Sequence, residues 1–252
     1  MLNLLPRPTI IAHRGASAYA PENTLAAFEL ALRQGADAIE LDAKLTADGQ
    51  VVVIHDQTVN RTTEGSGRVK DLTLAELRKL DAGSHFDIAF QGEPIPTLDE
   101  VFKAVGQLTH INVELTNYSS IYDDLPGKVA KLVKRHKLFR RVIFSSFNPV
   151  ALLRIRRLVP DAPIGLLALP GRKGWLARSW FGRLLTYQSL NLELNDVTPA
   201  LVKQTHRNGC YLYVYTINQA RMMHQLFDMD VDGIFTDDPV LARQVLTKVA
   251  DH

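Results

Sequence analysis

Three carboxylates and a lysine stand in a pattern that could hold a cation. Between Ile39 and Lys44 apolar and charged residues alternate, so on a strand Glu40, Asp42 and Lys44 would share one face. Glu114 lies in another strand-like run. Three ionised carboxylates placed close together must take up protons or share a cation. Because oxygen ligands without sulfur suit hard ions, the pattern predicts one bound divalent cation, Mg²⁺ or Ca²⁺.

Each of these residues also has a plainer interpretation. The alternating run could be an edge strand with a solvated polar face, and a single carboxylate could simply form an ion pair. The run lies between two helical segments, which favours an inner strand whose charges point inward. Arg14 and Lys44 together would still leave one of the three carboxylates unmatched.

Two histidines could transfer protons at such a site. His13 ends the first strand-like run, and His55 ends the run Val51 to His55. Asp48-Gly49 tolerates positive φ and suits a tight hairpin, so His55 should return to about the level of Asp42. Imidazoles titrate near neutral pH, and a pair of them can serve as general base and general acid.

The chain as a whole predicts the framework that brings these residues together. Short apolar runs alternate with helix-period segments: Ile10 to His13, Ala38 to Leu45, Ile111 to Thr116, Val142 to Phe147, Ile164 to Leu169, Leu190 to Leu194, Tyr211 to Asn218 and Gly233 to Asp237. Eight such strands in about 250 residues, without a glycine-rich dinucleotide loop, favour an α/β fold of the (β/α)8 TIM-barrel type over an open sheet. The carboxyl ends of barrel strands meet at one rim, where the carboxylates and histidines should converge.

One segment departs from the barrel pattern. Residues 57–97 are rich in glycine and proline around one helical piece, Thr73 to Leu80. We expect a small insertion after the second-strand hairpin, lying over the barrel mouth. With no repeat or linker in the sequence, residues 1–252 are expected to form a single barrel domain.

Short motifs run along nearly the whole chain: His13-Arg14-Gly15, Pro21-Glu22-Asn23-Thr24, Glu40-Leu41-Asp42, Thr46-Ala47-Asp48-Gly49, His55-Asp56, Arg61-Thr62-Thr63, Ile95-Pro96-Thr97-Leu98, Asn112-Val113-Glu114-Leu115 and Val231 to Asp237. In order and spacing the chain resembles the glycerophosphodiester phosphodiesterase family. The resemblance implies a (β/α)8 barrel that hydrolyses glycerophosphodiesters to glycerol 3-phosphate and an alcohol.

The resemblance also implies a role for each candidate residue. Glu40, Asp42 and Glu114 would be the metal ligands, and His13 and His55 would be the acid/base pair. Arg14 would contact the phosphate, and Glu22 would support that site through hydrogen bonds.

The sequence departs from the family pattern in three places. Thr116 stands where family members commonly carry Lys, and we expect Lys44 to supply the missing charge on the phosphate side. Tyr215 replaces the Trp of a late strand and is expected to contact the substrate, whereas His85 replaces an aromatic residue of the insertion. The last two changes should affect the choice of leaving group more than the chemistry.

Composition narrows the class of protein. The 252 residues carry 29 Lys and Arg against 27 Asp and Glu, a net charge of +2, which argues against nucleic acid as a partner. The single cysteine, Cys210, excludes an intramolecular disulfide and Cys-based metal sites. The first residues lack a basic stretch before an apolar one, and no apolar run reaches roughly 18 residues. These features predict a cytoplasmic protein with a small-molecule substrate.

The segment Gly171 to Leu185 contains both tryptophans, Trp175 and Trp180, together with Phe181 and four basic residues. It could make a weak contact with a membrane surface or an amphipathic ligand. The alternative is a barrel helix with its tryptophans and leucines packed inward, and such amphipathic helices are common in barrels.

We therefore expect a metal-dependent phosphodiesterase. A lysophospholipase D-type activity on the same scaffold is one alternative, and a non-catalytic binder of phosphodiesters or divalent ions is another. The His13 and His55 pair argues against the binder, because binding alone needs no acid and base. The residues do not decide which histidine is the general base and which is the general acid. They also leave open whether water or the substrate's own glycerol hydroxyl attacks the phosphate.

Overall fold

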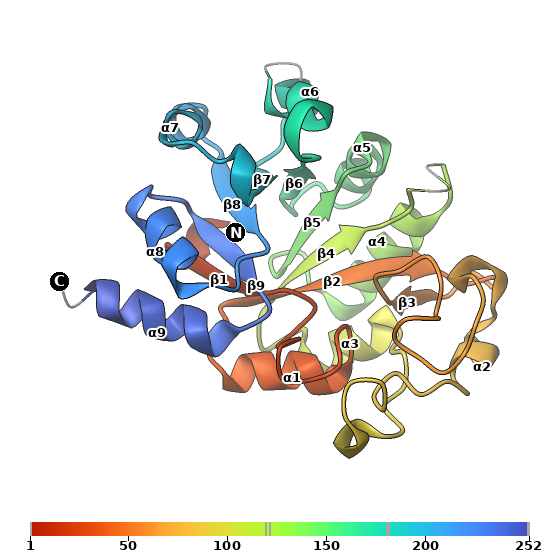
Figure 1. The fold of residues 1–252 in the computed structure, drawn as a ribbon. Helices are drawn as coiled ribbons and strands as arrows, with labels where there is room; N and C mark the ends of the chain where they lie inside the picture. Colours follow the sequence, from red (N-terminus) through yellow and green to blue (C-terminus); the bar gives the residue numbers. More distant parts are fainter. Residues whose placement is uncertain (1, 119, 121, 180–181, 251–252) are drawn as a thin grey trace.

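The protein is described here by a computed structural model covering residues 2–118, 120, 122–179 and 182–250. Within these ranges eight parallel strands close into a barrel, because β1 pairs with both β2 and β9 (Figure 1). The barrel strands are β1 (Thr9–Ala12), β2 (Ala38–Leu45), β4 (His110–Leu115), β5 (Val142–Ser146), β6 (Ile164–Leu167), β7 (Ser189–Glu193), β8 (Tyr211–Tyr215) and β9 (Gly233–Thr236). The predicted (β/α)8 barrel is confirmed, with strand ends that differ from the expected ones by up to three residues.

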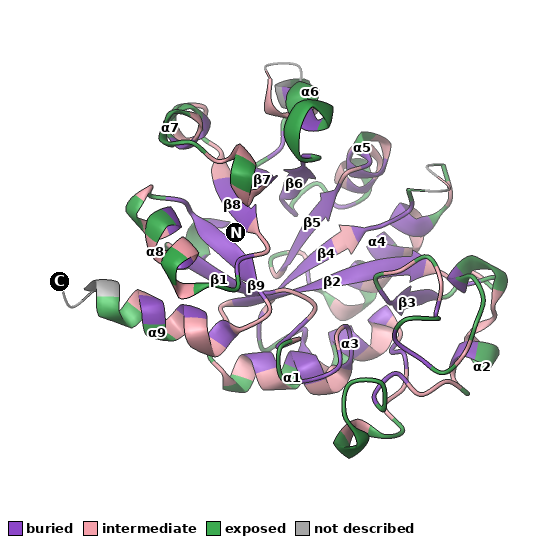
Figure 2. Ribbon diagram, viewed as in Figure 1, coloured by how far each residue is buried: buried purple, intermediate pink, exposed green. Residues whose placement is uncertain are grey.

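Helices surround the barrel and bury one face each. They are α1 (Leu25–Arg33), α3 (Leu98–Val105), α4 (Leu125–His136), α5 (Pro149–Leu158), α7 (Pro199–Arg207), α8 (Ala220–Asp228) and α9 (Pro239–Ala250). In α3, Leu98, Val101, Phe102 and Val105 recur at helical spacing and are all buried. Figure 2 shows the consequence, with buried strands at the centre and exposed residues on the outer side of the helices. None of the helices in the described part of the chain combines the length and apolar character needed to span a bilayer.

The predicted hairpin after β2 is present. Strand β3 (Val51–Val53) runs antiparallel to β2, with Val53 opposite Ala43. Gly49 turns the chain with φ of +72°, a conformation that glycine adopts without strain. The Ile54 amide donates to the Asp42 carbonyl at 3.0 Å, so His55 lies one residue past the level of Asp42.

Residues 57–97 form an irregular segment beside the hairpin, orange to yellow in Figure 1. It contains η2 (Val69–Asp71), α2 (Leu74–Leu77) and η3 (Ile88–Phe90). A small apolar cluster of its own holds it against the hairpin: Val52, Ile54, Val59, Val69, Leu77, Ala82 and Ile95. The helical piece is shorter than Thr73 to Leu80. Its position over the mouth, and the single domain for residues 1–252, stay predictions.

The connection from β6 to β7 differs from the other barrel crossovers. It consists of η4 (Gly171–Gly174), the four-residue α6 (Trp175–Arg178) and η5 (Gly182–Leu185), with no long helix in the described residues. Trp175, Leu176 and Leu184 are 60%, 56% and 69% exposed. The inward-packed barrel helix is therefore wrong for these three side chains, and Trp180 and Phe181 lie outside the described residues.

Candidate active site

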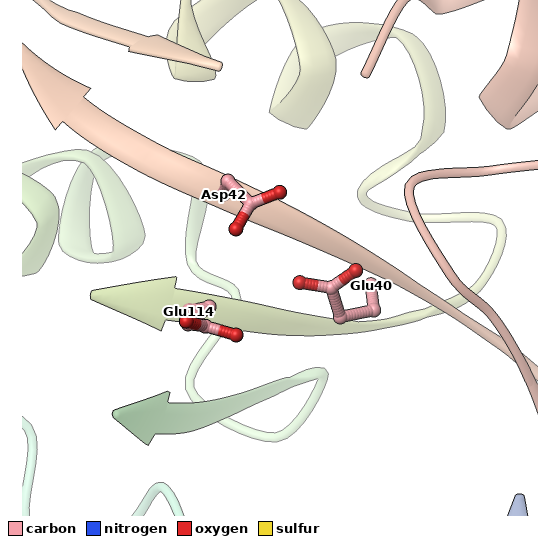
Figure 3. Close-up of side chains that lie close together, drawn as sticks. All are labelled: Glu40, Asp42 and Glu114. Carbon is pink, nitrogen blue, oxygen red and sulfur yellow. The ribbon is translucent and has the colours of Figure 1, made fainter. Parts of the chain in front are cut away.

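Three carboxylates gather on two neighbouring strands. Glu40 and Asp42 lie on β2, and the parallel register sets Asp42 beside Glu114 of β4 (Figure 3). One oxygen from each carboxylate lies within 4.8 Å of the others. Glu40 and Asp42 are buried and Glu114 is half-buried, so the cluster has little access to water that could screen its charge.

The electrostatics of this cluster show a shortage of positive charge. Burial, together with the charges of Asp42 and Glu114, raises the pKa of Glu40 well above its usual range. Burial and Asp42 raise the pKa of Glu114 to about 8. Arg14 opposes both shifts without cancelling them. A set of three oxygen donors that resists ionisation on its own fits a hard divalent cation, which would stabilise the ionised carboxylates.

The loop after β1 attaches Arg14 to this cluster. The Arg14 backbone amide donates to Glu40 Oε2 at 3.0 Å, and Nε of the Arg14 side chain lies 3.4 Å from Asp42 Oδ2. Burial opposes ionisation, but Asp42 and Glu22 together raise the pKa of Arg14. Gly15 allows this loop to pack on α1, because a Cβ there would lie 2.6 Å from the Ala27 carbonyl carbon. The guanidinium is therefore held as a permanent cation beside the carboxylates.

The two residues before α1, Asn23 and Thr24, have different hydrogen-bonding roles. Thr24 begins the helix, its hydroxyl accepting from the Ala27 amide at 3.3 Å. Asn23 adopts φ of +58° and donates from Nδ2 to Asp42 Oδ2 at 2.9 Å. Thr24 therefore caps the helix, whereas Asn23 orients a carboxylate.

His13 follows β1 and is held by a carboxylate at the end of β9. Its Nδ1 lies 2.7 Å from Asp237 Oδ1. Asp237 also accepts from Ser17 Oγ at 3.0 Å and Asn218 Nδ2 at 2.5 Å. Burial alone would raise the pKa of Asp237, but these hydrogen bonds lower it. The imidazole therefore faces a carboxylate held in its ionised form.

His55 is held in the same way by the residue that follows it. Its Nδ1 lies 2.7 Å from Asp56 Oδ1. Arg61 donates to Asp56 Oδ2 at 2.8 Å, and this hydrogen bond lowers the pKa of Asp56 to about 2. Arg61 also donates two 2.7 Å hydrogen bonds to Glu22, which accepts a third from Arg14 at 2.9 Å. Glu22 thus links the support of His55 to Arg14.

A cavity of about 240 Å³ brings most of the predicted residues together. Those that line it are His13, Arg14, Glu40, His55, Glu114 and Tyr215. The Tyr215 hydroxyl donates to the Ala168 carbonyl at 2.7 Å, and its ring lies edge-on to Phe147 at 6.3 Å between centroids. Because that hydroxyl is engaged, Tyr215 offers the cavity mainly its ring.

Lys44 does not line this cavity. It lines a neighbouring one of about 170 Å³, next to Thr116. Its Nζ donates to Thr116 Oγ1 at 2.7 Å, and burial lowers its pKa. The role of Lys44 toward phosphate stays a prediction, supported by its place two residues after Asp42.

Several residues that hold the candidate site residues in place were not predicted from the sequence. Asp56, Arg61 and Asp237 lie inside recognisable motifs, and a carboxylate next to or after a histidine could have been read as its partner. Asn23 gave no such signal, since Asn is equally common as a helix cap. Tyr118, whose hydroxyl donates to Glu114 Oε1, gave none either.

Comparisons with known proteins identify the family of this chain. The sequence profile of the glycerophosphoryl diester phosphodiesterase family matches residues 13–241. A glycerophosphodiester phosphodiesterase of Caldanaerobacter subterraneus is 44% identical over 91% of this chain and 94% of its own. A protein of Bacillus subtilis named as a putative glycerophosphodiester phosphodiesterase is 42% identical over the same shares.

A solved structure of similar shape carries a ligand. It is an Oleispira antarctica phosphodiesterase in complex with the product sn-glycerol-3-phosphate. It is 31% identical to this chain, with a TM-score of 0.89 over 97% of this chain and 98% of its own.

Proposed function

Since the chain belongs to the glycerophosphoryl diester phosphodiesterase family and is a phosphodiesterase, we propose that it hydrolyses glycerophosphodiesters to glycerol 3-phosphate and an alcohol in the cavity described above. The observation that carries the proposal is the convergence on one cavity of two carboxylate-held histidines and two members of the acidic cluster, Glu40 and Glu114. The product bound to the Oleispira antarctica phosphodiesterase supports glycerol 3-phosphate as the product here.

Glu40, Asp42 and Glu114 would hold one divalent cation, Mg²⁺ or Ca²⁺, which when bound draws negative charge away from the phosphate oxygens. Arg14 lines the cavity as a cation of fixed charge and would bind another phosphate oxygen. Glu22 and Asp42 restrict the guanidinium, so that little conformational freedom is lost when phosphate binds.

The two histidines would move the protons. Because Nδ1 of each ring is hydrogen-bonded to a carboxylate, Nε2 is the nitrogen left for proton transfer. One imidazole removes a proton from the attacking hydroxyl group, and the other gives a proton to the oxygen of the departing alcohol. Asp237 and Asp56 stabilise the imidazolium that forms in each case. Our proposal includes a cytoplasmic location, which the low cysteine content supports.

The test is release of glycerol 3-phosphate from glycerophosphocholine. Activity should disappear after dialysis against a chelator and return on addition of Mg²⁺ or Ca²⁺. Full activity after exhaustive chelation would refute the assignment of the acidic cluster. Absence of glycerol 3-phosphate with either ion would refute the proposed reaction.

A further inference from the structure

A second, larger cavity of about 460 Å³ adjoins the catalytic one. Phe147 and Leu167 line both, so the two cavities meet at these side chains. Most of the other lining side chains come from the start of α5, from β6 and from the β6–β7 connection, among them Pro149, Leu166, Leu169, Leu176, Ala177 and Leu184. Its volume falls within the range of roughly 300–1,000 Å³ typical of ligand pockets.

The lining of this cavity is hydrocarbon. Among the described residues that line it, only Lys173 carries a charge, and Lys173 is exposed. Leu169, Leu176 and Leu184 are 46%, 56% and 69% exposed. Apolar side chains gathered around a hollow and left in contact with water favour an apolar ligand that would cover them.

The wall formed by the β6–β7 connection is anchored rather than loose. Arg178 donates to Asp196 Oδ2 at 2.7 Å and to the Leu169 carbonyl at 3.1 Å. Asp196 also accepts from the Gly171 amide at 2.9 Å. The ion pair is largely covered, with side chains 17% and 13% exposed. The cavity is therefore formed before any ligand arrives, which lowers the entropic cost of binding.

We propose that this cavity binds one acyl chain, and that the substrates of the enzyme include lysophospholipids, phosphodiesters of glycerol that carry a single chain. This inference rests on the proposed function, since the phosphodiester must lie at the acidic cluster while the chain extends past Phe147 and Leu167. For lysophosphatidylcholine, water supplies the oxygen of the new P–O bond and the P–O bond to choline breaks. One proton of the water reaches the choline oxygen, so the products are lysophosphatidic acid and choline.

Two other occupants fit the lining less well. A polar or charged head group would find Lys173 as its one charged partner among the described lining residues. A bilayer surface would contact the exposed rim of the Gly171 to Leu185 segment but would leave the interior of the hollow unfilled. A single chain fills it, and each methylene removed from water favours binding by roughly fourfold.

The experiment compares glycerophosphocholine with 1-acyl lysophosphatidylcholine below its critical micelle concentration. The two substrates share the phosphocholine group and differ only in the acyl chain, and choline release reports both. We expect kcat/KM for the acylated substrate to be at least tenfold higher, mainly through a lower KM, because the chain binds away from the reacting atoms.

Two variants alter the cavity without touching the catalytic residues. Ala177→Phe fills it, and the double variant Leu176→Gln with Leu184→Gln makes its rim polar at positions that already face water. Each should lower kcat/KM for lysophosphatidylcholine by roughly tenfold and leave glycerophosphocholine within twofold. The matched control is Leu108→Gln, a leucine 69% exposed that precedes β4 at the opposite end of the barrel, and it should change neither substrate.

The outcomes separate this inference from the proposed function. Hydrolysis of glycerophosphocholine without a gain from the acyl chain overturns the acyl subsite alone, and so do equal losses on both substrates in the double variant. A double variant that binds vesicles less well but hydrolyses monomeric lysophosphatidylcholine normally also overturns it, in favour of a membrane contact. No hydrolysis of either substrate refutes the proposed function itself.

Discussion

The two sides of the catalytic cavity are built on different principles. On the side of β1, β2 and β4, each charged group has a bonded partner within the chain, such as Asn23 for Asp42 and Asp237 for His13. On the other side, Phe147, Leu167 and the ring of Tyr215 present apolar surface. In the proposed reaction the charged side binds the phosphate and moves protons, whereas the apolar side selects the group attached to the phosphate. Changes on the first should therefore affect every substrate, and changes on the second only some.

The largest effect is expected from the carboxylates of the charged side. Asp42→Asn or Glu114→Gln should weaken metal binding and lower kcat by roughly a thousandfold or more on every substrate, since a bound ion contributes several kcal/mol to the transition state. Calorimetric titration with Mg²⁺ or Ca²⁺ and choline release measure the two effects.

The control for the carboxylates is Glu29→Gln in α1. The Glu29 side chain is about half exposed, and its carboxylate lies 4.0 Å from the exposed Arg33 guanidinium, so it forms only a weak surface ion pair. This variant should bind metal and turn over normally. Asp42→Asn with unchanged metal affinity would contradict the ligand assignment, whatever its rate.

The next largest effect concerns the histidines. His13→Ala and His55→Ala should each lower kcat by roughly a hundredfold or more, and each should remove one limb of the pH–rate profile. His136 provides a matched control, because its Nε2 lies 2.9 Å from Asp99 away from the cavity. His136→Ala should leave both limbs in place. Near-normal kcat in both cavity variants would refute the acid/base roles.

The charged side was the part that sequence could predict. The proposed chemistry requires acidic side chains at Glu40, Asp42 and Glu114 and imidazoles at His13 and His55. The strand periodicity and the hairpin predicted where these residues lie to within one position. Such residue types have few substitutes for this chemistry, so their spacing carries information.

The apolar side could not be predicted in this way. Leu176 and Leu184 could equally face a barrel or a cavity, because any apolar side chain serves either purpose. The connection that contains them forms short helical turns instead of one long barrel helix in the described residues. Lys44 shows a related limit. Its strand face was predicted, but its hydrogen bond to Thr116 depends on how two neighbouring strands meet, which no local pattern records.

A smaller effect should appear in the stability of the metal-free protein. The folded-state pKa values of Glu40 and Glu114, the latter about 8, lie above those of an unfolded chain. Their contribution to stability is therefore fully present below about pH 4 and is lost as pH rises through about 8. We expect the Tm of chelated protein to fall between pH 5 and pH 8, by about 2–4 °C for each kcal/mol lost.

Bound metal should remove this dependence, because the cation stabilises the ionised carboxylates. Glu114→Gln should also flatten it without metal. Asp56, with its pKa of about 2, stays ionised throughout the interval and adds no slope. A Tm that rises between pH 5 and pH 8 in the chelated protein would contradict the assigned shifts.

The smallest effect tests how far the charged side extends. Lys44 lines the neighbouring cavity rather than the catalytic one, yet it lies on the same strand face as Asp42. Lys44→Met should lower kcat/KM by roughly threefold to tenfold on glycerophosphocholine and lysophosphatidylcholine alike, because a nearby cation attracts the phosphate whatever group it carries. Lys70→Met removes an equal charge from an exposed position of the same cavity and should cost less than twofold. Equal effects of the two variants would mean that Lys44 contributes only to the overall positive potential around the cavity. A loss on one substrate alone would mean that Lys44 acts on substrate choice, as the apolar side does.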